Sequence, residues 1–248
     1  MASSALPGPP GPLRDAALAA LPGHWADRVW AGTRFAAAAQ PTLPTGYPAL
    51  DAQLPGGGWP ASGLTELLFD APGSGEWRLL APALRAQAAL RPLACVAPPL
   101  QPHAPALQAL GLPLQRVVWV TPPDGAHAAA DAAWALEQAL RSGGIGTALW
   151  WGDAGTAMLR RLHLAALEQG CWLLALRPPA ARGQSSPAPL RLACRAAAGG
   201  RLAIDVFKRR GPAQAAPLLL RLPPVAGQPP EFLPDHAVAG TASAVAAA

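Results

Sequence analysis

Charged side chains are scarce in this chain, and lysine is almost missing. Charged residues make up 13% of the 248 residues, Lys208 is the only lysine, and asparagine is absent. A hydrophobic fraction of 51% argues against wholesale disorder. The formal net charge of +5 would fit a nucleic-acid partner. However, a GC-rich genome also produces arginine-rich, lysine-poor chains, so the positive charge alone does not indicate DNA binding.

Cysteine is equally rare, which excludes a disulfide framework. Cys95, Cys171 and Cys194 each lie inside an apolar run, and no C-x-x-C pair occurs. They are typical of small core residues in a reducing compartment. The N-terminus has no basic segment followed by an apolar stretch, and prolines or charges interrupt every long apolar run. We therefore expect a cytoplasmic protein without a signal peptide or a membrane span.

The stretch Thr65–Leu80 carries the most specific pattern. It predicts an apolar strand, the loop Gly73-Ser74-Gly75, and a helix with leucines on one face. This is the arrangement of a phosphate-binding P-loop, in which backbone N–H groups and a helix N-terminus hold an anion. The P-loop pattern would also need glycine at position 70, lysine at 76 and serine or threonine at 77. This chain has Asp70, Glu76 and Trp77 there.

The rest of the chain predicts an α/β protein. We expect a disordered start, helices and a linker over residues 1–42, a core over 43–223 and a proline- and alanine-rich tail over 224–248. Strands and helices alternate through the core, which indicates a mostly parallel sheet flanked by helices. The expected strands are 64–69, 93–97, 116–120, 145–151 and 171–176. The expected helices are 76–90, one ending near Gly111, 124–141 and 156–168.

The pattern changes after residue 177. A loop rich in proline, glycine and serine runs from Pro178 to Pro187. Three further strands, expected over 190–194, 201–207 and 217–222, indicate a C-terminal antiparallel extension. Earlier in the core, Pro82 lies inside the helix over 76–90, where it should kink the helix or remove one backbone hydrogen bond.

The chain resembles the RecA-type recombination ATPases along Thr45–Leu222. The motif T-G-x-x-x-L-D, a glycine-rich turn, a strand and a P-loop frame follow one another as in that superfamily. More narrowly, it resembles the ImuA family. The run L-P-T-G-Y-P-A-L-D-A-Q-L-P-G-G-G-W-P followed by L-T-E-L-L carries this resemblance, with W-x-G at Trp30–Gly32 and V-F-K-R-R-G at Val206–Gly211.

The resemblance implies a RecA-like core and a role in damage-induced (SOS) translesion DNA synthesis. ImuA-like proteins work beside ImuB, a catalytically inactive homologue of the Y-family polymerases. An error-prone replicative-type polymerase takes part indirectly, and RecA is a further expected partner. The resemblance therefore implies an accessory protein in DNA repair and mutagenesis.

The residues that such an ATPase needs are missing from the matching positions. Catalysis requires a lysine on the phosphates, a hydroxyl and a carboxylate on Mg²⁺, and a glutamate that positions water. The chain has Glu76 and Trp77 in the loop, Trp151 at the metal carboxylate and Pro98-Pro99 at the glutamate. Asp153 could replace the carboxylate only if its strand shifted, and it is otherwise a surface acid. We expect no catalytic residue, no metal and no cofactor, with the glycine loop kept as a structural turn or as a weak anion site.

Other residues could contact partners. The basic positions that could meet an acidic protein surface or DNA phosphates are Lys208, Arg209 and Arg210, with Arg182 in the Pro178–Pro187 loop; they could equally be a solvated edge. Trp25 and Trp30 in the N-terminal segment could dock on a partner or pack on the core. Two alternative functions remain open: a SulA-like inhibitor of cell division, and an ATP-dependent RecA-type recombination enzyme.

Overall fold

The computed structural model describes residues 41–223. The predictions for residues 1–40, including Trp25 and Trp30, and for the tail over 224–248 fall outside these residues. Helical segments include α4 (Pro48–Asp51), α5 (Glu76–Leu90), α6 (Ala104–Ala109), α7 (Ala128–Arg141) and α8 (Thr156–Glu168). The strands are β1 (Thr42–Leu43), β2 (Trp59–Pro60), β3 (Gly63–Phe69), β4 (Leu93–Val96), β5 (Val117–Val120), β6 (Thr147–Trp151), β7 (Trp172–Arg177), β8 (Leu190–Ala197), β9 (Arg201–Lys208) and β10 (Leu218–Arg221).

One eight-stranded sheet organises the described residues. Its strand order is β10-β9-β8-β3-β7-β6-β4-β5. The six strands from β8 to β5 run parallel to one another, whereas β9 and β10 continue the sheet in antiparallel pairing. The small second sheet pairs β1 with β2. The prediction of a mostly parallel α/β sheet with a C-terminal antiparallel extension is confirmed.

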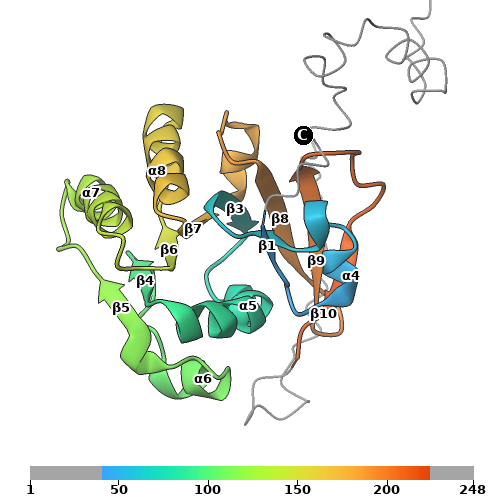
Figure 1. Ribbon diagram of the computed structural model, residues 1–248. Coiled ribbons are helices and arrows are strands. Elements are labelled where there is room, and N and C mark those ends of the chain that lie inside the picture. The colour runs from blue at the N-terminus through green and yellow to red at the C-terminus, as the bar shows by residue number, and fades with distance from the viewer. Residues whose placement is uncertain (1–40, 224–248) are drawn as a thin grey trace, which may run out of the picture. The chain divides into compact units, whose positions relative to one another are not determined.

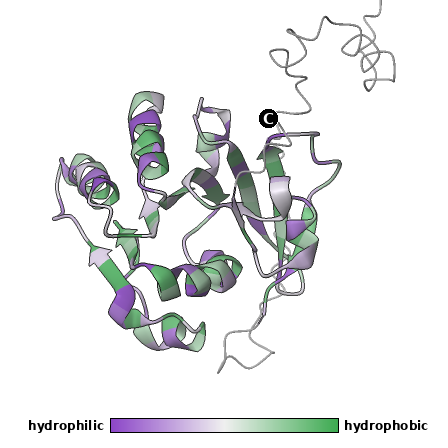
Figure 2. Cartoon of the chain, in the orientation of Figure 1, coloured by the Kyte–Doolittle hydropathy of each residue, from purple (hydrophilic) through white to green (hydrophobic). Residues whose placement is uncertain are grey.

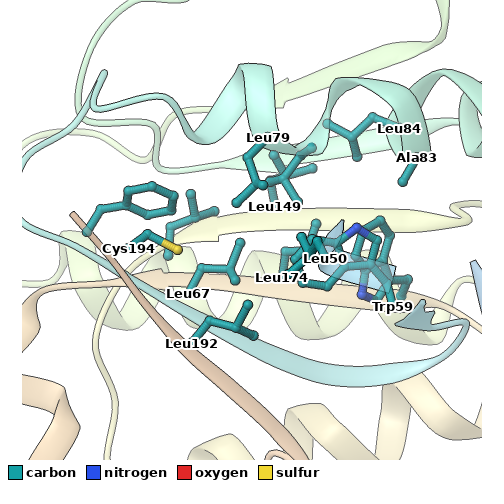
Figure 3. Close-up of a cluster of buried hydrophobic side chains, with 14 of the residues drawn as sticks. Leu50, Trp59, Leu67, Leu79, Ala83, Leu84, Leu149, Leu174, Leu192 and Cys194 are labelled. Atoms are coloured by element: carbon teal, nitrogen blue, oxygen red, sulfur yellow. The ribbon is translucent and has the colours of Figure 1, made fainter. Parts of the chain in front are cut away.

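Helices cover both faces of the parallel strands (Figure 1). Helices α7 and α8 pack on one face, where leucines and alanines form one buried cluster. Helix α5 packs on the other face together with α4, and the second cluster there extends to β9 and β10. Figure 3 shows that Leu67 and Leu192, from the central strands, lie beneath Leu79 of α5. The strands in the middle of Figure 2 are accordingly mostly hydrophobic along their length, because water reaches neither side.

Several boundaries differ from the sequence-based expectation; strand β8, for example, extends to Ala197 rather than to residue 194. Helix α7 begins at Ala128 rather than at residue 124, because Gly125 has a φ of +150°, which is incompatible with a helix. Strand β6 begins at Thr147 rather than at residue 145, where its pairing with both β4 and β7 starts. Thr42, expected at the end of the linker, instead forms strand β1 with Leu43 and pairs with β2.

The backbone hydrogen bond that Pro82 removes from α5 is replaced by a hydrogen bond from Tyr47, which directly precedes α4. Pro82 has no N–H to give to the carbonyl of Arg78, four residues earlier. The hydroxyl of Tyr47 donates a hydrogen bond to that carbonyl over 2.7 Å. A Cβ on Gly46, whose φ is +83°, would lie 2.4 Å from Cβ of Pro82. The T-G-Y-P motif is therefore shaped to dock on α5 at Pro82.

The three cysteines are buried and unpaired, as the sequence predicts. Burial raises the pKa of the Cys171 thiol to about 12, and it also raises the pKa of Cys95 and Cys194. Over residues 41–223, none of the helices is both long enough and apolar enough to cross a membrane.

Candidate functional site

The carboxyl ends of the parallel strands meet at one edge of the sheet and surround a hollow of about 310 Å³. Phe69, Trp151 and Arg177 are the last residues of β3, β6 and β7, and all three line it. Crevices at this edge are where open α/β sheets bind ligands. A second, adjoining hollow of about 150 Å³ shares Glu76 and Trp151 with the first.

Two backbone amides of the loop between β3 and α5 donate hydrogen bonds to the side chain of Glu76. The N–H groups of Gly73 and Gly75 lie 2.6 Å and 3.1 Å from the two carboxylate oxygens of Glu76. Glu76 is the first residue of α5 and only 3% exposed. Gly73 and Gly75 have φ values of +82° and +115°, which glycine adopts at little cost. In a phosphate-binding loop such amides face the bound anion; here a carboxylate of the chain takes that place.

Two tryptophans are in contact at the positions that the sequence analysis matched to the two magnesium ligands of an ATPase. The rings of Trp77, on α5, and Trp151, at the end of β6, have centroids 5.6 Å apart. Trp119 on β5 extends the group, with its ring centroid 6.3 Å from that of Trp77. Positions 77 and 151 therefore lie next to each other in space. Indole rings offer no metal ligand, and their contact is an apolar one.

Prolines form the remaining wall. Pro98-Pro99, at the position expected for a water-positioning glutamate, follow β4 and line the smaller hollow. Their side chains can neither accept nor hold a proton. Among residues 41–223, no group of three or more histidine, cysteine, aspartate or glutamate side chains could hold a metal ion.

Negative charge dominates the larger hollow. Its lining contains three carboxylates, those of Asp70, Glu76 and Asp153, against the single guanidinium of Arg177. Asp70 is exposed, and it makes no ion pair with any residue that the structure describes. An anion entering this hollow would be repelled, because two like charges about 4 Å apart interact unfavourably by about 4 kcal/mol at an effective dielectric of about 20.

Comparisons with known proteins do not assign a family. No protein-family model matches the chain, and no curated protein matches it. Among solved structures, the crystal structure of SulA from Pseudomonas aeruginosa matches with a TM-score of 0.38 and 27% sequence identity, over 46% of this chain and 97% of that chain. A likeness of this size carries neither fold nor function from that protein to this chain.

A buried ionic network lies behind the hollow, and the sequence analysis missed it. Glu66, in the middle of β3, is fully buried and accepts hydrogen bonds from Arg177 at 3.2 Å and from Arg191 at 2.7 Å. Arg177 is also fully buried and pairs with Asp153, which is 45% exposed. Asp153 is therefore more than a loop acid, since it neutralises a buried guanidinium. The signal available in the sequence was a charged residue within or at the end of three apolar runs, namely Glu66, Arg177 and Arg191.

This network holds the loop that follows β7. Arg191 donates to the carbonyls of Gln184 at 3.1 Å and of Ala181 at 2.7 Å. The side chains of Gln184 and Ser186 bond Arg177 and Glu66 respectively. Residues Pro179–Gly183 form a 3₁₀ turn within it. The Pro178–Pro187 segment, expected as a plain loop, is anchored from below by buried charges.

The candidate basic residues are mostly engaged within the protein. Arg182 pairs with Asp205 at 2.7 Å, and its guanidinium lies 4.4 Å from the ring centroid of Phe207. Lys208 donates to the carbonyl of Ser186 over 2.7 Å, and Arg209 donates to the carbonyls of Pro212 and Gln53. Partial burial, and then the nearby charge of Arg191, lowers the pKa of Lys208, although Glu66 opposes the shift.

Arg210 differs from its neighbours, because it is exposed and has no side-chain hydrogen bond to another residue within 41–223. Three of the four basic candidates make hydrogen bonds or an ion pair within the protein, but Arg182 and Lys208 are exposed as well as Arg210.

Proposed function

We propose that this protein is a non-catalytic adaptor of damage-induced translesion DNA synthesis, which binds an ImuB-like homologue of the Y-family polymerases and RecA. The observation that supports the non-catalytic part is the Glu76 carboxylate seated on the amides of Gly73 and Gly75. The partners come from the sequence resemblance to the ImuA family.

The loop geometry argues against the alternative of an ATP-dependent recombination enzyme. A nucleotide phosphate would have to displace a buried carboxylate from its two amides and then occupy a site lined by Asp70 and Asp153. The contact between Trp77 and Trp151 leaves neither hydroxyl nor carboxylate for Mg²⁺ at those positions. Four independent losses would have to be compensated before the site could hydrolyse ATP.

The adaptor role is tested by partner binding together with phenotype. The full chain should co-purify with an ImuB-like protein from the same genome, and deletion of its gene should reduce damage-induced mutagenesis. Absence of both effects overturns the proposal. Binding of ATP with DNA-stimulated hydrolysis would favour the recombination enzyme instead, and filamentous cells on overexpression would favour a SulA-like division inhibitor.

A further inference from the structure

We propose that the smaller hollow at the carboxyl edge of the sheet binds a proline-rich segment of this same chain, which follows β10 beyond the described residues. We call the site the tryptophan hollow and define it by Trp77, Trp151, Pro98 and Pro99. The occupant, which we call the proline segment, is residues 228–234 with the sequence Q-P-P-E-F-L-P. Because the contact is internal to the chain, the proposal does not rest on the adaptor function.

The first argument is the apolar wall of the tryptophan hollow. Its volume is about 150 Å³, which suits a single ring-sized side chain. Trp77 and Trp151 are half-buried, and Leu100, which also lines the hollow, is 64% exposed. Among the described residues of the lining, the one carboxylate is that of Glu76, and the loop amides already hold it. An apolar guest would therefore release water from tryptophan and leucine at little polar cost.

The second argument is the place where the chain leaves the described residues. Leu222, directly after β10, is buried beside the glycine loop, since a Cβ on Gly75 would lie 2.9 Å from its Cδ1. Trp77 follows Gly75 by two residues, which is at most about 7 Å of backbone. Residues 223–227 join Leu222 to the proline segment, and at about 3.1 Å per residue they span about 15 Å. The proline segment is therefore tethered within reach of the tryptophan hollow.

The third argument is the match between the segment and the wall. The proline segment carries the pair Pro229-Pro230, followed by Phe232 and Pro234. Proline-rich segments dock in grooves lined by aromatic side chains, because the polyproline II conformation is already restricted and little entropy is lost on binding. Attachment through a short linker also gives the segment an effective concentration of about millimolar. The docked segment would shield the two tryptophans from other proteins until it is displaced.

The test uses the full chain with a nitroxide label at Ala237→Cys, just beyond the proline segment. The three native cysteines are buried, so the new thiol is labelled selectively. We expect the indole ¹⁵N–¹H signals of Trp77 and Trp151 to be lost and to return when the nitroxide is reduced. The matched control carries the same label with Pro229→Ser, Pro230→Ser and Phe232→Ser, and it should keep both signals. Equal loss with and without these substitutions would overturn the proposal.

Two leucines locate the contact on the core. Leu100→Ser removes exposed apolar surface from the tryptophan hollow and should restore the two indole signals in the labelled chain. Leu164→Ser changes a leucine of similar exposure, 56%, on α8 at the opposite face of the sheet, and it should leave the loss unchanged. Equal effects of the two substitutions would place the segment elsewhere and contradict the proposal.

Two further measurements distinguish other occupants. Unlabelled ¹⁵N-enriched chain is mixed with labelled chain at natural isotope abundance; signal loss in this mixture would assign the contact to a second copy and overturn internal docking. A synthetic peptide of residues 228–236 should bind the triple serine variant about tenfold more tightly than it binds the wild type, because the attached segment competes in the wild type. Equal affinity for the two chains would show that the hollow is not occupied from within.

Discussion

Replacing Glu66 by glutamine should strongly destabilise the protein, because it removes the negative charge between two buried guanidiniums. The side chains of Glu66 and Arg177 are fully buried, and that of Arg191 is 6% exposed. After Glu66→Gln, Arg177 keeps Asp153 as a partner, but Arg191 is left with carbonyl acceptors only. Breaking a buried ion pair by removing one member costs about 3–5 kcal/mol.

The chain provides a matched control in Glu137 of α7. Its carboxylate also lies between two arginines, Arg141 at 3.0 Å and Arg161, but these side chains are 52% and 53% exposed. Water can therefore solvate both guanidiniums after Glu137→Gln. Such pairs contribute about 0–1 kcal/mol each, so the same substitution, which removes two of them, should cost about 2 kcal/mol or less.

Urea unfolding followed by far-ultraviolet circular dichroism measures both costs. For a chain of this size, about 3–5 kcal/mol corresponds to a fall in Tm of about 6–20 °C. The Glu137 variant should fall by only a few degrees. If the free energies of unfolding of the two variants agree within about 1 kcal/mol, the ionic network does not stabilise the sheet in the way described.

Three further predictions concern Tyr47 of the T-G-Y-P motif, His163 of α8 and the glycine loop. Tyr47→Phe should lower the free energy of unfolding by about 1–2 kcal/mol, because it leaves the carbonyl of Arg78 without a donor. In a Pro82→Ala background the helix supplies an N–H to that carbonyl, so the cost should be much smaller. A double-mutant cycle by urea unfolding measures this coupling. Burial, together with a nearby lysine charge, lowers the pKa of His163, whose Nδ1 accepts a backbone hydrogen bond at 3.0 Å. The neutral form of His163 should therefore stabilise the fold fully above pH 6.5, and this stabilisation should be lost as pH falls through the lower pKa of the folded state. The difference in free energy of unfolding between wild type and His163→Gln should accordingly change below pH 6.5 and stay constant above it. The double variant Glu76→Lys, Trp77→Thr should gain no ATPase activity in a phosphate-release assay, and measurable turnover would show that the other missing residues are dispensable.

Local patterns made most of the fold predictable. Alternating apolar runs, each bounded by glycine or proline, located the strands of the parallel sheet and helices α5 and α8 within a few residues. The substitutions at Glu76 and Trp77 were visible because a P-loop is a contiguous motif. Its geometry was not: nothing in the sequence indicates that the Glu76 carboxylate turns back onto the loop amides.

The ionic network could not be predicted, for a physical reason. Glu66 meets Arg177 and Arg191 across 111 and 125 residues of chain, and these contacts exist only because β3 lies between β7 and β8 in the sheet. Strand order depends on crossover connections rather than on the residues within a strand. Pairing of the three charges therefore follows from topology, which the local pattern does not specify.

The carboxylate of Glu76 has a consequence for timing. A loop that binds a nucleotide alternates between occupied and empty states, and hydrolysis then sets how long a partner stays bound. The amides of Gly73 and Gly75 are instead satisfied by a group covalently attached to the same helix, at 2.6 Å and 3.1 Å. With both amides bonded to Glu76, the loop offers no vacant anion site of the kind that a nucleotide cycle uses. Under the proposed adaptor role, the lifetime of a complex is then set by how fast the partners dissociate, and its abundance by how much of each protein the cell makes.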